Sequence, residues 1–146
     1  MSDAVLIVIG NSFRRDDGVG LAVAEEIGRC GLTGVRVVTA IGEPAAILDA
    51  WTGARLAVVV DAAMGEGARP GRIRRWTPGD SVVANMLSSH AFGLPQAYAL
   101  GEALGRLPER LVGLTVDIAD ASLGVGLTSP VADAVPALIS AVLAEF

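Results

Sequence analysis

Between Val5 and Gly20 the sequence reads V-L-I-V-I-G-N-S-F-R-R-D-D-G-V-G. The apolar run that ends at Ile9 predicts a short strand buried on both faces, and the Gly10-Asn11 pair predicts its end. Gly18 opens a stretch whose apolar residues recur at four-residue spacing, which is typical of an amphipathic helix. The segment therefore predicts a strand, a loop and a helix, and in α/β proteins the loop carries the chemistry.

The loop itself argues against a dinucleotide-binding site. Seven residues separate Gly10 from Gly18, whereas the G-x-G-x-x-G fingerprint keeps its glycines close to the strand end. Asp16 and Asp17 stand at the helix entrance, where two negative charges would repel a phosphate. A cation suits this position better. The structural alternative is that one of the two aspartates simply caps the helix N-terminus.

Composition and charge limit the class of protein. The chain has 146 residues, 52% of them hydrophobic, which predicts a single domain over 1–146 with a full core. Its net charge of −5 and the lack of a long basic block argue against a nucleic-acid partner. The first apolar run is too short for a signal peptide or a membrane span. Cys30 stands alone, which fits a reducing compartment, so we expect a cytoplasmic protein without a membrane partner.

Strands and helices alternate along the first 61 residues. Short apolar runs at 5–9, 35–40 and 56–61 predict strands, and helical patterns fall between them. A further helix is predicted at 94–104, a strand at 110–117 and a last helix from about 130. This pattern predicts an α/β fold, namely a mostly parallel twisted sheet of about five strands with helices on both faces.

Residues 72–77 predict a short edge strand with Arg72, Arg74 and Trp76 on one face. Arginines in such a strand usually solvate and protect the edge of the sheet. A substrate-docking role for this basic patch is the alternative.

Asp61 and His90 are further candidates for a site. Asp61 ends the third predicted strand, and in sheets of strand order 2-1-3-4-5 this strand lies beside the first one at the topological switch point. His90 precedes the helix predicted at 94–104 and could reach the same crevice. Taken singly, Asp61 could cap a turn and His90 could be an ordinary loop residue. Together with the Asp16-Asp17 pair they would form an oxygen- and nitrogen-donor site for a divalent ion such as Ni²⁺ or Zn²⁺.

Three motifs in this order resemble the hydrogenase maturation endopeptidases. They are Gly10-Asn11 followed by Asp16-Asp17-Gly18, the strand end at Asp61, and Ser88-Ser89-His90. The resemblance covers essentially the whole chain and implies a twisted sheet between helices. It also implies a protease that removes the C-terminal extension from the large-subunit precursor of a [NiFe] hydrogenase. The family often has Glu where this chain has Asp17.

The resemblance also implies roles for individual residues. Asp17, Asp61 and His90 would bind the metal, which is nickel already held by the cysteines of the precursor; Zn²⁺ or Cd²⁺ could substitute for it. Asp16 would orient the loop, cap the helix or act with the other three in catalysis. Asn11 would pin the loop or hold the substrate backbone, and Gly10 would help to bind the substrate. The enzyme is expected to act as a monomer on its precursor partner.

Two other functions stay open on the sequence. The first is a non-catalytic metal-dependent binding or checkpoint module on the same fold, which would use the same three ligands. The second is a nucleotide-binding α/β domain, against which the acidic helix entrance argues.

Overall fold

The computed structural model describes residues 4–41, 43–64, 67–78 and 93–146. Their secondary structure runs in the order β1 Ala4–Ile9, η1 Arg15–Gly18, α1 Val19–Cys30, β2 Val35–Ala40, α2 Pro44–Trp51, β3 Leu56–Ala63, β4 Ile73–Trp76, α3 Leu94–Leu104, β5 Leu111–Asp117 and α4 Ser129–Leu143. The predicted α/β class and the alternation of strands and helices are confirmed.

The described strands form one five-stranded sheet in the order β2-β1-β3-β5-β4. The first four are parallel, and β4 pairs antiparallel with β5 at the edge. The predicted neighbours β1 and β3 do lie side by side, but the fourth strand is not inserted between β3 and β5. Only residues 64–72 join β3 to β4, which is too short for the crossover of a dozen or more residues that a parallel neighbour requires.

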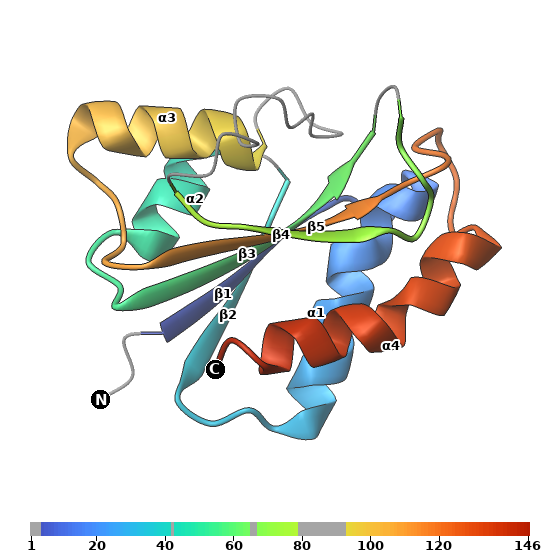
Figure 1. Ribbon diagram of the computed structural model, residues 1–146, viewed down its shortest axis with the longest axis horizontal. Coiled ribbons are helices and arrows are strands. Elements are labelled where there is room, and N and C mark those ends of the chain that lie inside the picture. Colours follow the sequence, from blue (N-terminus) through green and yellow to red (C-terminus); the bar gives the residue numbers. More distant parts are fainter. Residues whose placement is uncertain (1–3, 42, 65–66, 79–92) are drawn as a thin grey trace.

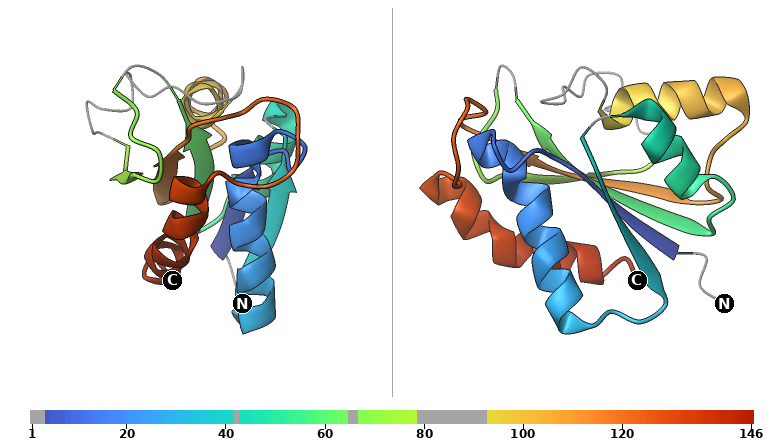
Figure 2. Two further views of the ribbon diagram at one scale, coloured as in Figure 1. Left: turned by 90° about the vertical axis from the view of Figure 1, so that its right-hand side faces the viewer. Right: turned by 180° about the vertical axis from the view of Figure 1, so that it is seen from behind.

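Helices cover both faces of the sheet, as predicted. Figure 1 shows α2 and α3 on one side and α1 and α4 on the other, and Figure 2 shows the same layers from two further directions. None of the described helices is both long and apolar enough to cross a lipid bilayer.

Two apolar cores separate the layers. Alternate residues of the central strands point to opposite faces, so each strand contributes to both cores. Val8, Val58 and Val60 pack toward α1 and α4, whereas Ile7 and Val59 pack toward α2 and α3. Every residue of β1 and β3 is buried, which explains why both strands read as continuous apolar runs.

Candidate functional site

The first part of the loop after β1 is held by its own backbone and by the side chain of Asn11. The amide of Asn11 donates to the carbonyl of Asp17 over 3.2 Å, and the Oδ1 atom of Asn11 accepts a bond from the amide of Phe13 at 2.9 Å. A Cβ atom at Gly10 would overlap the carbonyl oxygen of Asp17, so only glycine fits there. Asn11 and Gly10 therefore hold the loop in shape, which was one of the two roles expected for Asn11.

Asp16 and Asp17 have different environments although they are adjacent. Neither one caps a helix by its side chain: α1 begins after Gly18, and no side-chain bond caps η1 or α1. The alternative that one of the aspartates caps the helix is therefore wrong, because the N-cap residues are Arg14 and Gly18. The short 3-10 turn η1 instead buries both carboxylates, leaving Asp16 fully covered and Asp17 1% exposed.

Asp16 anchors the β1 loop to the loop after β5. Its Oδ2 atom accepts bonds from the amides of Ala119 (2.9 Å) and Asp120 (3.0 Å), and its Oδ1 atom accepts one from the amide of Thr128 at 2.6 Å. The hydroxyl of Thr128 bonds to both oxygens. This arrangement matches the loop-orienting role expected for Asp16.

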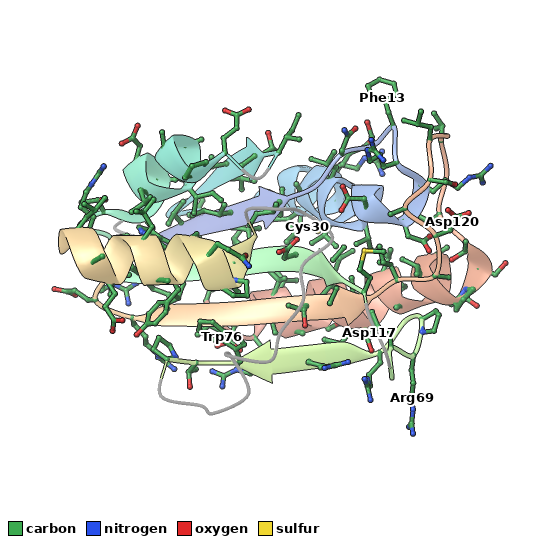
Figure 3. All side chains as sticks on the ribbon, turned by 90° about the horizontal axis from the view of Figure 1, so that it is seen from above. Phe13, Cys30, Arg69, Trp76, Asp117 and Asp120 are labelled. Carbon is green, nitrogen blue, oxygen red and sulfur yellow. The ribbon has the colours of Figure 1, made fainter. Side chains whose placement is uncertain are left out.

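Backbone contacts strengthen the junction of the two loops. Arg14 and Gly124 form a parallel β-bridge, and the amide of Gly124 donates to the carbonyl of Phe13 at 2.9 Å. Arg15 lies in the left-handed region with φ of 45°, a conformation that costs a non-glycine residue about 1–3 kcal/mol. Its amide bonds to the carbonyl of Gly124 at 3.0 Å, which helps to hold that conformation. Figure 3 shows Phe13 at the tip of the first loop and Asp120 on the second.

Asp17 and Asp61 lie near the carboxyl ends of two adjacent strands, β1 and β3. The η1 turn that carries Asp17 contacts β3, the strand that carries Asp61. Asp61 is 1% exposed, and its Oδ2 atom accepts a bond of 3.3 Å from the amide of Leu94, the first residue of α3. The positive end of the α3 dipole thus faces this carboxylate, an arrangement that favours negative charge there. The structure places two of the three predicted metal ligands at one edge of the sheet.

The third predicted ligand, His90, lies outside the described residues. Within the ranges that are described, no three His, Cys, Asp or Glu side chains form a group able to hold a metal. Asp17 and Asp61 nevertheless suit a divalent cation, because carboxylate oxygens are its usual donors and a cation would offset the cost of burying two negative charges.

A cavity of about 310 Å³ opens beside the β1 loop. Its lining includes Gly10, Asn11 and Phe13 of the β1 loop, and Ile41 and Glu43, which follow β2. Phe13 and Ile41 are exposed by 68% and 58%, so both present apolar surface to solvent. The two residues predicted to bind substrate, Gly10 and Asn11, thus line a cavity.

The sequence reasoning did not single out Asp117, at the end of β5. This side chain is fully buried, and its Oδ2 atom accepts bonds of 2.9 Å from the amide of Arg69 and from the guanidinium groups of Arg72 and Arg74. Burial acts to raise the pKa of Asp117, but the bonds from Arg69, Arg74 and Arg72 outweigh it and the pKa lies below its ordinary value. The available signal was an aspartate at a strand end, the same feature that drew attention to Asp61.

Comparison with known proteins identifies the family. The hydrogenase maturation protease family model matches residues 22–145. This chain belongs to the hydrogenase maturation protease family. A sequence search against curated proteins finds no significant match.

Solved structures of maturation proteases share the fold. The hydrogenase maturating endopeptidase HybD from E. coli superposes with a TM-score of 0.82 at 19% identity, over 97% of this chain and 91% of that one. The [NiFe] hydrogenase maturation protease HybD from Thermococcus kodakarensis gives 0.71 at 24% identity, over 97% and 98% of the two chains. The endopeptidase HycI from Escherichia coli gives 0.70 at 25% identity, over 96% and 88%.

Family membership confirms the resemblance drawn from the three motifs. This maturation protease carries Asp61 and His90 inside the segment that the family model matches, whereas Gly10, Asn11 and Asp17 precede it. The roles of individual residues stay predictions.

Proposed function

We propose that this maturation protease removes the C-terminal extension from the large-subunit precursor of a [NiFe] hydrogenase. The observation that carries the proposal is the pair of buried carboxylates, Asp17 and Asp61, at the carboxyl edge of the sheet. This edge is where open α/β sheets bind their ligands. The cavity beside the β1 loop, lined by Gly10 and Asn11, would give a peptide a place to lie near the loop that carries Asp17.

Nickel enters this proposal as part of the substrate. The precursor would present the ion on its own cysteines, and Asp17, Asp61 and His90 would complete the coordination. A metal held there would polarise the scissile carbonyl or lower the pKa of an attacking water. Cleavage would then depend on prior metal insertion. Zn²⁺ or Cd²⁺ would occupy the same donors as substitutes.

The chain's own residues have separate tasks in this scheme. A carboxylate of Asp17 or Asp61 that is not bound to metal would take the proton of the attacking water as general base. Asp16 would hold the loop in place rather than bind metal, because both of its oxygens already accept hydrogen bonds from amides of the 119–128 segment. Asn11 and Gly10 would set the shape of the loop that faces the substrate.

The test is cleavage of a purified large-subunit precursor with and without bound nickel. We expect nickel-dependent release of the C-terminal peptide, reduced about 100-fold or more by Asp17→Asn, because even residues that merely orient a metal ligand matter by about 10- to 100-fold. Asp49→Asn is the matched control, since it removes an exposed carboxylate of α2 that pairs with Arg106.

Three results would change the proposal. If a nickel-loaded cognate precursor binds but is not cut, a metal-dependent binding module describes the chain better. Equal cleavage with and without nickel would support the protease but contradict the dependence of cleavage on metal insertion. An Asp17→Asn variant as active as Asp49→Asn would show that Asp17 is not a ligand.

A further inference from the structure

A row of polar residues crosses three strands on the α3 face of the sheet. Asp61 of β3 is in register with Thr115 of β5, and Thr115 is in register with Arg74 of β4. Residues in register across adjacent strands point to the same face. Arg74 therefore lies on the same face as the candidate site, two strands away from Asp61.

Asp117 fixes the position of Arg72 and Arg74. Its fully buried carboxylate bonds to both guanidinium groups at 2.9 Å, while the two arginine side chains stay 37% and 39% exposed. Figure 3 shows Asp117 close to the edge of the sheet and Arg69, whose amide also bonds to Asp117, projecting beyond it. Asp117 thus holds both guanidinium groups, while each arginine side chain stays partly exposed to solvent.

Two polar atoms of this row make no hydrogen bond within the described ranges. The Nε atom of Arg74 and the Oγ1 atom of Thr115 are buried and have no hydrogen-bond partner in the part of the chain that is described. Buried polar atoms without a partner are rare in folded proteins and need an explanation. Because both atoms are covered, a ligand would instead meet the exposed parts of the Arg72 and Arg74 side chains.

The charge of the cluster selects the ligand. Two guanidinium groups meet one carboxylate, so the cluster of Arg72, Arg74 and Asp117 is one positive charge in excess on a chain whose net charge is −5. A single carboxylate matches this excess, and planar guanidinium groups bind carboxylates through paired hydrogen bonds. A phosphate dianion would exceed the available charge.

The geometry points to Arg72 and Arg74 as the docking site for a carboxylate of the substrate near the scissile bond, an inference that rests on the proposed function. Two strand spacings of about 4.8 Å put the backbone of Arg74 about 10 Å from that of Asp61. An extended peptide advances about 3.3 Å per residue. The acidic group is therefore expected about three residues from the bond that is cut.

The test measures binding of synthetic peptides that span the cut site of the cognate precursor. One peptide keeps its acidic residues, a second carries Asn or Gln in place of those within about three positions of the cut, and a third has an amidated C-terminus. The variants are Arg74→Gln and Arg74→Lys. The matched control is Arg75→Gln, which removes the same charge from the same strand but pairs with Glu145 instead.

We expect Arg74→Gln to weaken binding of the acidic peptide about tenfold, the lower end for a bond to a charged group, because the site is partly exposed. Arg74→Lys should recover part of this loss, and Arg75→Gln should cause none. The amide-substituted peptide should bind wild type and Arg74→Gln equally. If only the amidated C-terminus removes the difference, the docked group is the terminal carboxylate of the extension.

Each further outcome counts against one proposal at a time. If Arg74→Gln and Arg75→Gln weaken peptide binding equally, the docking site is overturned. It is also overturned if Arg74→Gln weakens binding tenfold for both the amide-substituted peptide and the peptide with the amidated C-terminus. A cognate precursor without any carboxylate within reach overturns it as well. Charge-dependent binding by a wild-type protein that cuts no precursor would leave the docking site standing and contradict the proposed protease. Melting temperatures of all variants show that each one is folded.

Discussion

Replacing Asp16 by asparagine tests whether this residue is an anchor for the two loops. The substitution keeps the size of the side chain but exchanges one oxygen for an amide group that only donates. Both oxygens of Asp16 now accept bonds from backbone amides, one from Thr128 and the other from Ala119 and Asp120. In either orientation, the new amide group must face at least one backbone donor.

The expected cost follows from those contacts. Hydrogen bonds to a charged group contribute about 1.5–3 kcal/mol each, and a buried donor left unsatisfied costs about 1–3 kcal/mol. Loss of one or two such bonds should therefore lower the free energy of unfolding by about 3 kcal/mol. For a domain of this size each kcal/mol shifts the melting temperature by about 2–4 °C, so Asp16→Asn should melt about 10 °C below the wild type.

Urea unfolding and thermal melting measure this change directly. Asp49→Asn serves as the control, because its ion pair with Arg106 lies on the surface and such pairs contribute at most about 1 kcal/mol. Activity should be measured at a temperature where Asp16→Asn is fully folded. If Asp16→Asn lowers the free energy of unfolding by less than about 1 kcal/mol, Asp16 is not an anchor for the two loops. A folded variant that is stable but inactive would instead give Asp16 a direct part in catalysis.

Two further predictions use matched variants or a pH series. Gly10→Ala should lower the free energy of unfolding by about 1–3 kcal/mol and reduce cleavage, because the added methyl group overlaps the carbonyl of Asp17. Gly28→Ala, which meets no atom within 4 Å on α1, should be neutral or stabilising by up to about 1 kcal/mol; equal behaviour in thermal melts would contradict the steric argument. For Asp117, whose pKa is lowered from 3.8, the carboxylate stabilises the fold above that pH and loses this effect as the pH falls through the lower folded value. The difference in free energy of unfolding between wild type and Asp117→Asn should therefore shrink below pH 3.8. Urea unfolding at a series of acid pH values measures it, and a constant difference would contradict the lowered pKa.

The sequence predicted the frame of the fold because its signals are local. Continuous apolar runs identified β1 and β3, since strands buried on both faces have no polar side. A glycine marked the end of α1, where Gly31 adopts φ of 68°. The edge strand β4 was also anticipated from its arginines. Its position beyond β5 was not, because strand order depends on the length of the connection rather than on the strand's own residues.

The candidate site was predictable only in part, for a reason of distance along the chain. Asp16 and Asp17 look alike in the sequence, and a cap was the simplest alternative for either. Their difference comes from partners such as Ala119 and Thr128, 103 and 112 residues further on. Asp117 was missed for the same reason, because Arg72 and Arg74, 45 and 43 residues before it, give it a role.

The junction between the β1 loop and the 119–128 segment also bears on how the protein is made. The ribosome releases the first strand and helix early, but the amides that bond to Asp16 belong to Ala119, Asp120 and Thr128, near the other end of the chain. Since Asp17 follows directly on this anchor, the nascent chain would keep the turn that carries Asp17 unfixed until synthesis is almost finished. A half-made molecule would then have no ordered site with which to cut other proteins.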